Sequence, residues 1–98
     1  MDKVLDKELI SKTIVATFAE VLRVSYDEID QNKSFYGNGG YSLAAIKALS
    51  AINKLFNTNI ELAAFVNAKR IPDLSEQFLL DAGTRVPVIG GSLMKGSI

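Results

Sequence analysis

The first regular pattern along the chain is a run of apolar residues with helical spacing near its start. Ile10, Ile14 and Phe18 recur every four positions, and charged residues fall mostly between such positions. This spacing gathers apolar side chains on one stripe, so the sequence predicts a helix over about residues 6 to 23. Asp6 suits its N-cap, because a carboxylate there accepts hydrogen bonds from first-turn N–H groups.

Three later patterns predict three more helices. Apolar residues return every three or four positions over about residues 42 to 57, and a short apolar segment follows over about 61 to 67. Pro72 then stands where a first helical position would be, and Gly83 stops the last helix. The apolar positions of these three helices are Leu43, Ile46, Leu49, Ile52 and Phe56, then Leu62, Phe65 and Val66, then Leu74, Phe78 and Leu79.

A segment without periodicity separates the first two predicted helices. It runs from residue 25 to 41 and is rich in Asp, Asn, Gly and Ser, so we expect a loop. A connection of this length in so small a domain tends to be functional. We expect Ile29 and Phe35 to pin the loop to the core, and Tyr36 to pack there beside Phe35.

Together these patterns predict an all-α fold. We expect an up-and-down four-helix bundle with three long helices and one short helix. The chain of 98 residues, 48% of them apolar, has the size of one compact domain. We expect this domain over residues 1–82, and a flexible C-terminal tail over residues 83–98, where Gly, Ser and Pro replace the helical pattern.

Composition excludes several classes of function. The chain has no His and no Cys, which rules out a Ser-His-Asp triad, a thiol nucleophile, a disulfide framework and an ordinary zinc site. Its 11 basic and 11 acidic side chains leave no basic footprint for nucleic acid. No apolar stretch approaches the roughly 20 residues of a membrane span, and no signal-peptide run follows Met1. We therefore expect a cytoplasmic protein without a metal and without catalysis of its own.

The candidate chemistry lies where a glycine-rich turn, Gly37-Asn38-Gly39-Gly40-Tyr41, delivers the hydroxyl of Ser42 to the start of the second predicted helix. A hydrolase nucleophile elbow, Gly-x-Ser-x-Gly, would need glycine at position 44, where the chain has alanine, and a histidine base. A phosphate loop is excluded too, because neither Gly-x-Gly-x-x-Gly nor a Gly-Lys-Ser/Thr ending occurs. From the residues alone, Ser42 is most simply a helix N-cap.

The wider context of Ser42 resembles a known family. The run Ser34-Phe35-Tyr36-Gly37-Asn38-Gly39-Gly40-Tyr41-Ser42-Leu43, with Ala45, Leu49, Phe56 and Ile60 following, is similar to the thiolation (peptidyl carrier) domains of nonribosomal peptide synthetases. The resemblance covers about residues 6 to 80 and implies an acyl carrier protein-like bundle. It implies that a phosphopantetheinyl transferase attaches 4′-phosphopantetheine from coenzyme A to Ser42. Gly39 and Gly40 would then remove side-chain bulk beside Ser42, which lets the transferase approach.

Three features depart from or imitate the family pattern. Asn38 stands where many members have Leu, and we expect this to loosen the anchoring of the turn. Lys69-Arg70 replaces the family's Pro-Thr ahead of the last helix, which leaves the path between the last two helices open. Ser92, in Gly90-Gly91-Ser92-Leu93, is a decoy, because the intervening residue and a following helix are missing.

The resemblance favours a peptide-synthetase carrier over a fatty-acid carrier. Fatty-acid carriers usually have Asp-Ser-Leu and an acidic second helix, whereas here Tyr41 precedes the serine and the helix holds Lys47 and Lys54 without an acid. The resemblance also implies a partner-binding surface around the attachment serine and along the second and third helices. Its nominated residues are Tyr41, Leu43, Ala44, Lys47, Phe65 and Val66. For Leu43, Phe65 and Val66, a place in the core is an equal alternative.

The predicted function is that of a carrier and not of an enzyme. It would hold an activated amino or aryl acid as a thioester on 4′-phosphopantetheine at Ser42. Its partners would be an adenylation enzyme and condensation, thioesterase or other tailoring enzymes. We expect a monomer, and the first predicted helix begins close enough to Met1 to favour a free-standing carrier. The alternatives are a carrier for fatty-acid or polyketide chains, and an unmodified helical interaction module in which Ser42 is only a cap.

Overall fold

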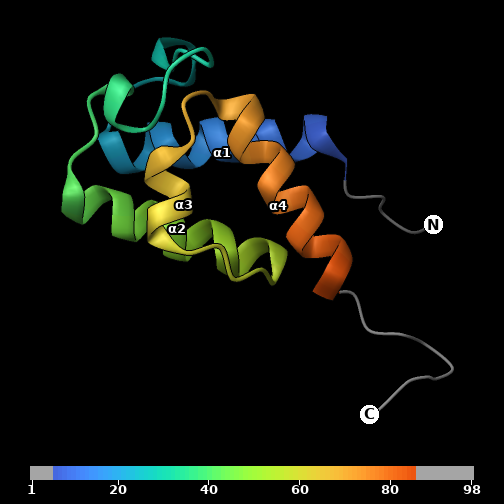
Figure 1. The fold of residues 1–98 in the computed structure, drawn as a ribbon. Helices are drawn as coiled ribbons and strands as arrows, with labels where there is room; N and C mark the ends of the chain where they lie inside the picture. The colour runs from blue at the N-terminus through green and yellow to red at the C-terminus, as the bar shows by residue number, and fades with distance from the viewer. Residues whose placement is uncertain (1–5, 86–98) are drawn as a thin grey trace, which may run out of the picture.

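The fold is built from helices joined by loops (Figure 1). The computed structural model describes residues 6–85. The elements in this range are α1 (Lys7–Leu22), the 3₁₀ helices η1 (Tyr26–Glu28) and η2 (Tyr36–Asn38), α2 (Ser42–Phe56), α3 (Leu62–Asn67) and α4 (Ile71–Arg85). Three of the α-helices are long, α3 is short, and the described residues form no strand. The predicted all-α fold of four helices is confirmed.

Helix α1 is the element against which α2 and α4 pack. It runs antiparallel to α2 and is crossed obliquely by α4 (Figure 1). Asp6 caps it as predicted, because its Oδ1 accepts from the Leu9 N–H at 2.9 Å. At the other end Arg23 takes the left-handed conformation (φ 62°), and its N–H returns to carbonyl groups of the last turn. Ile10, Ile14 and Phe18 of its apolar stripe are fully buried.

Helix α2 turns small side chains towards the core. The buried residues of α2 are Ala44, Ala45, Ala48, Leu49 and Ile52. Small residues allow two helices to approach each other closely, which is what an alanine stripe facing α1 provides. Leu43 and Ile46 lie outside this stripe, with 58% and 51% of their surface exposed. The helical spacing that groups Ile46 with the buried positions is therefore misleading, and of the two alternatives left open for Leu43 the surface is the one observed.

The long loop between α1 and α2 is held by buried apolar residues. Ile29 and Phe35 are both buried, as predicted. The Phe35 ring centroid lies 4.8 Å from that of Phe18 on α1 and 5.7 Å from that of Phe65 on α3. Tyr36 touches Phe35 at a centroid distance of 6.0 Å but remains 42% exposed, so its predicted place in the core is wrong. One aromatic cluster thus joins the loop to two helices.

Helix α4 is longer at both ends than predicted. It begins at Ile71, so Pro72 occupies the second helical position. Proline is tolerated there because first-turn N–H groups have no partner within the helix. Gly83 lies inside α4, which continues to Arg85, so the predicted stop at Gly83 is wrong and residues 83–85 of the predicted tail are helical. A single glycine costs a helix only about 1 kcal/mol relative to alanine. The rest of the predicted tail, residues 86–98, lies outside the described residues.

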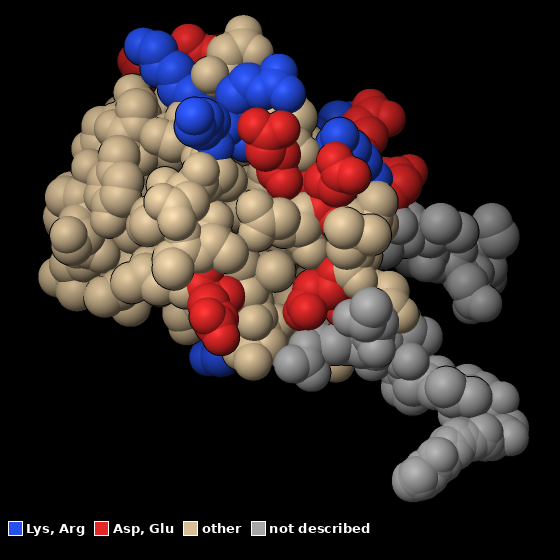
Figure 2. All heavy atoms as spheres, viewed as in Figure 1, with Lys and Arg blue, Asp and Glu red and all other residues tan. Residues whose placement is uncertain are grey.

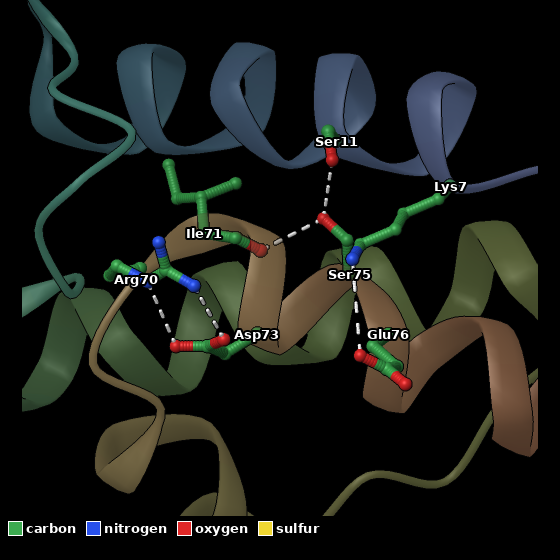
Figure 3. A network of polar contacts seen from close by, with 7 residues as sticks. All are labelled: Lys7, Ser11, Arg70, Ile71, Asp73, Ser75 and Glu76. Carbon is green, nitrogen blue, oxygen red and sulfur yellow. Dashed lines mark hydrogen bonds and ion pairs between the residues drawn. The ribbon is translucent and has the colours of Figure 1, made fainter.

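A partly buried hydroxyl pair links α4 to α1 (Figure 3). The Ser75 hydroxyl donates to the Ile71 carbonyl at 2.9 Å, and its oxygen lies 2.6 Å from Ser11 Oγ. A hydroxyl has one hydrogen, so Ser11 is the donor in the second bond. Ser75 is fully buried, and both of its hydrogen bonds are therefore needed to offset the loss of water.

Arg70 organises the start of α4, where the chain departs from the family's Pro-Thr. Its carbonyl accepts from the N–H groups of Asp73 and Leu74, at 3.1 and 3.2 Å. Its guanidinium donates two hydrogen bonds to the Asp73 carboxylate, at 3.2 and 3.3 Å (Figure 3). This contact lowers the pKa of Asp73 below its ordinary value of 3.8. Arg70 therefore both begins the helix and pairs with an acidic residue of its first turn.

Candidate functional site

Ser42 is the first residue of α2 and does not cap it. Tyr41 is the N-cap, with an extended backbone (φ −137°, ψ 170°), and its carbonyl accepts from the Ala45 N–H at 2.8 Å. The Ser42 side chain is exposed, and among residues 6–85 its hydroxyl has no hydrogen-bond partner. The interpretation of Ser42 as a cap is wrong, because the residue lies one position too far into the helix. Its hydroxyl is free to react.

The backbone around Ser42 favours a negative group on that hydroxyl. Within the described part of the chain, no acceptor pairs with the first-turn N–H groups of Ser42, Leu43 and Ala44. These groups and the helix dipole make a helix N-terminus a favourable environment for an anion, by typically 0.3 to 1 kcal/mol. A phosphate ester at Ser42 would sit at this end of α2.

The two glycines before Tyr41 have different structural tasks. Gly39 takes the left-handed conformation (φ 95°) that ends η2, and its N–H donates to the Tyr36 carbonyl at 2.9 Å. At Gly40, a Cβ would overlap the Phe35 ring and lie 2.8 Å from the Phe35 carbonyl oxygen. Phe35 thus fills the space beside Gly40, which gives this glycine a structural role, and its role in admitting a transferase stays a prediction. Gly40 lets the turn rest on the core.

Asn38 anchors the turn, contrary to prediction. Its Oδ1 accepts from the Asp30 N–H at 2.7 Å, and its Nδ2 donates to the carbonyls of Asp30 at 3.0 Å and Ser34 at 2.9 Å. The leucine of many family members could make none of these hydrogen bonds. The expectation that Asn38 loosens the turn is wrong. The composition of the segment gave no sign of this, since the partners are backbone groups of residues four and eight positions away.

The surface beside Ser42 is mostly apolar, with Lys47 as a charged side chain on it. Tyr41 is 59% exposed, and the space-filling view shows no Lys, Arg, Asp or Glu over the left side of the molecule, where α2 begins (Figure 2). This region includes Tyr41 and several exposed or partly exposed residues of α2 and α3. They are Leu43, Ile46, Lys47, Leu62 and Val66. Sequence analysis did not nominate Ile46 and Leu62 for this surface and named them only as apolar positions of the second and third predicted helices.

Two of the residues nominated for partner binding lie in the core instead. Ala44 and Phe65 are each 1% exposed, so neither can touch a partner in this structure. Ala44 belongs to the alanine stripe of α2, and Phe65 packs against Phe18 and Phe35. Val66 is partly buried against the same core, whereas Leu43 is exposed. The choice between core and surface thus falls differently for Leu43, Val66 and Phe65.

The described residues offer neither a metal site nor a membrane span. Residues 6–85 hold no group of three or more Asp or Glu side chains that could bind an ion. None of the helices in this range is both long and apolar enough to cross a bilayer. What remains at the site is one free hydroxyl on a fixed turn beside an apolar surface.

Comparison with known proteins decides which family uses such a hydroxyl. The family model described as phosphopantetheine attachment site matches residues 12–78, more than half of the chain. The chain belongs to this family. The attachment domain is also 34% identical over 73 residues to isonitrile lipopeptide synthase of Mycobacterium tuberculosis. It is 27% identical over 64 residues to nonribosomal peptide synthetase ataP of Aspergillus terreus.

The matches cover most of the attachment domain and little of its relatives. They span 74% and 65% of this chain but only 3% and 4% of the two synthetases. The resemblance to peptidyl carrier domains, the acyl carrier protein-like fold and 4′-phosphopantetheine as the cofactor are confirmed. The attachment domain is a phosphopantetheine carrier, and a role without catalysis of its own fits this family. The matched region includes Ser42, whose free hydroxyl and helix N-terminus fit a phosphate ester.

Proposed function

We propose that Ser42 is the attachment residue and that the domain carries amino or aryl acids in nonribosomal peptide synthesis. The observation that carries the proposal is the exposed Ser42 hydroxyl, which has no hydrogen-bond partner among the described residues and begins α2. Both relatives are called synthetases or synthases of peptide-type products, which supports the second half of the proposal.

Each residue near Ser42 has a task in this proposal. Phe35 and Gly40 hold the turn on the core, and Gly39 supplies the left-handed bend that leads into α2. The Ser42 oxygen therefore faces an incoming enzyme from a fixed position. In the modification, Ser42 Oγ loses its proton and forms the bond to phosphorus, while adenosine 3′,5′-bisphosphate leaves coenzyme A. The free N–H groups of the first turn face the charge that remains.

The proposed cargo is an amino or aryl acid, because the proposed loading partner is an adenylation enzyme. When bound, 4′-phosphopantetheine supplies a thiol that holds a carboxylic acid as a thioester, a sulfur that this chain lacks because it has no Cys. An adenylation enzyme would load the amino or aryl acid, and condensation, thioesterase or other tailoring enzymes would receive it. In these exchanges, the domain would hold the attached group in position and leave it accessible to the enzymes.

We propose that these enzymes dock on the exposed residues beside Ser42. The docking face consists of Tyr41, Leu43, Ile46, Lys47, Leu62 and Val66. Exposed apolar residues that cluster beside a reactive group are typical of a surface that binds proteins. An enzyme that reaches the Ser42 oxygen must also approach Tyr41 and Leu43, since they flank it in the chain.

The charges of α2 favour peptide-synthetase partners over fatty-acid partners. The charged side chains of α2 are Lys47 and Lys54, and both are exposed. A basic docking patch on an enzyme would therefore meet repulsion from this helix rather than attraction. This argument separates our proposal from the alternative of a fatty-acid or polyketide carrier.

Intact-mass measurement tests the attachment residue. The domain is incubated with coenzyme A and a promiscuous phosphopantetheinyl transferase, and we expect the parent to gain one phosphopantetheine. Ser42→Ala should gain none, and Ser92→Ala, the matched control in the second Gly-Gly-Ser sequence, should gain one. Ser42→Ala should also keep its free energy of unfolding within about 0.5 kcal/mol, because no hydrogen bond is lost. Modification of Ser42→Ala would place the attachment elsewhere, and an unmodified parent would leave the interaction module as the function.

A loading assay tests the cargo class. The modified domain is offered to adenylation enzymes with amino or aryl acids, and to acyl ligases with fatty acids, and the thioester is measured by mass. We expect aminoacyl or aryl loading to be faster. Replacing Leu43 by Asp should slow loading without changing the circular dichroism spectrum, because Leu43 is 58% exposed. Faster fatty-acyl loading would support the alternative carrier.

A further inference from the structure

The Asn38 side chain makes a two-sided contact with one residue of the long loop. Its Oδ1 accepts from the Asp30 N–H at 2.7 Å, and its Nδ2 donates to the Asp30 carbonyl at 3.0 Å. The second Nδ2 hydrogen is satisfied by the Ser34 carbonyl at 2.9 Å. Asn38 therefore uses its acceptor and both donors on the backbone of its own loop.

The residues around Asp30 are themselves fixed to the helices. Ile29 is 8% exposed and belongs to the core. The Gln31 carbonyl accepts from the Ile71 N–H, the first amide of α4, at 3.0 Å. Asp30 lies between these two anchors, so its backbone is a firm point for Asn38 to hold.

On its other side, Asn38 leads directly into the turn before Ser42. The Phe35 carbonyl accepts from the N–H groups of both Asn38 and Gly40, at 3.1 and 3.0 Å. Gly40 in turn rests against the Phe35 ring, and Ser42 follows two residues later. The position of the Ser42 oxygen thus depends on the segment 37–41, and the Asn38 side chain fixes one end of this segment.

We propose that Asn38 is a positioning residue for the modification of Ser42. Its side chain holds the segment 37–41 in the arrangement that presents the Ser42 hydroxyl to the phosphopantetheinyl transferase. This inference rests on the proposed attachment at Ser42. Without the Asn38 contacts the segment populates other arrangements, and an enzyme that needs one arrangement binds more weakly in proportion to its population. KM for the domain rises, and kcat, measured with the transferase saturated, stays the same.

The chain offers a matched control at the opposite end of α2. The Asn53 side chain holds Ile60 in the same two-sided way, with Oδ1 accepting from its N–H and Nδ2 donating to its carbonyl, both at 3.0 Å. Oδ1 of Asn53 also accepts from the Thr58 hydroxyl at 2.7 Å. Asn53→Ala therefore loses a similar set of hydrogen bonds, but in the loop between α2 and α3 and three turns of helix away from Ser42.

The experiment measures transferase kinetics on unmodified parent, Asn38→Ala and Asn53→Ala with coenzyme A. We expect Asn38→Ala to raise KM for the domain about tenfold and to leave kcat within about twofold, because exposed or partly buried hydrogen bonds lie at the low end of the usual range and three of them together are then worth about that factor. Asn53→Ala should keep the KM of the parent, even if its unfolding midpoint falls by as much as that of Asn38→Ala. Asn38→Asp keeps the acceptor for the Asp30 N–H but turns a carboxylate oxygen towards the Asp30 and Ser34 carbonyls, so its KM should rise at least as much as that of Asn38→Ala.

Amide hydrogen exchange supplies a readout that does not involve the transferase. The Gly39 and Gly40 amides should exchange faster in Asn38→Ala than in the parent, and at the parent rate in Asn53→Ala. Equal KM for Asn38→Ala and Asn53→Ala, with unchanged Gly40 exchange, would overturn the inference. If Asn38→Ala does not fold by circular dichroism, the comparison is made with Asn38→Asp, and a KM equal to the parent's overturns it. Failure of the parent to be modified would instead overturn the proposed function.

Discussion

Replacing Gly40 by alanine tests the contact that holds the turn on the core. The new Cβ would overlap the Phe35 ring and lie 2.8 Å from the Phe35 carbonyl oxygen. The ring cannot move aside easily, because it is 2% exposed and packs against Phe18 and Phe65, with centroids 4.8 and 5.7 Å away. Overpacking in a core costs about 1 to 3 kcal/mol. Since a backbone atom is also in the way, we expect Gly40→Ala to cost about 2 to 3 kcal/mol.

Urea unfolding followed by circular dichroism measures this cost. Gly39→Ala is the control, because its Cβ would meet no atom within 4 Å and only the left-handed backbone opposes it. That strain costs about 1 to 2 kcal/mol, so Gly40→Ala should be the less stable variant. In a Phe35→Leu background the additional cost of Gly40→Ala should shrink, since part of the overlapping ring is gone. A Gly40→Ala protein within about 0.5 kcal/mol of the parent would refute the reasoning.

Three further predictions test other parts of the fold. Gly83→Ala should raise the free energy of unfolding by about 0.5 to 1 kcal/mol in urea, because alanine is the better helix former and its Cβ meets nothing. The Arg70 contact lowers the pKa of Asp73, so its stabilisation is present above the unfolded pKa and is lost as pH falls through the folded pKa. Asp73→Asn should remove that acid-side loss in pH-dependent melts, and an NMR titration of the carboxyl should give the lowered pKa. Ser75→Ala should cost about 1 to 2 kcal/mol in thermal melts, more than Ser11→Ala, because Ser75 is the fully buried partner.

The spacing of apolar residues was sufficient to predict all four helices, each to within three residues at its ends. The face of α2 was predicted less well. Leu43 and Ile46 have helical spacing with Leu49, but Ala44 and Ala48 occupy the neighbouring stripe. Hydrophobicity favours leucine and isoleucine for the core, whereas close packing against α1 favours small side chains. The alanine stripe is the signal that could have placed Ile46 on the surface and decided between surface and core for Leu43.

The turn before Ser42 could be located from its sequence but not explained by it. The motif and its context were enough to single out Ser42. That Tyr41 and not Ser42 is the N-cap depends on backbone angles that the motif does not specify. The role of Asn38 depends on Asp30, eight residues earlier, whose contribution comes from its backbone and so leaves no trace in residue type. Contacts of this kind become visible only when the loop has a defined path.

The unpaired hydroxyl of Ser42 bears on the stability of the domain before its cofactor is attached. The fold uses the hydrogen bonds of buried polar groups such as Ser75. Ser42 Oγ makes no hydrogen bond among the described residues, so the fold does not depend on it. The newly made domain is therefore already complete as a fold. An enzyme that modifies it therefore acts on a folded domain and does not need to help it fold. Attachment then adds to the stability of the domain only the gain of about 0.3 to 1 kcal/mol that a negative group has at a helix N-terminus.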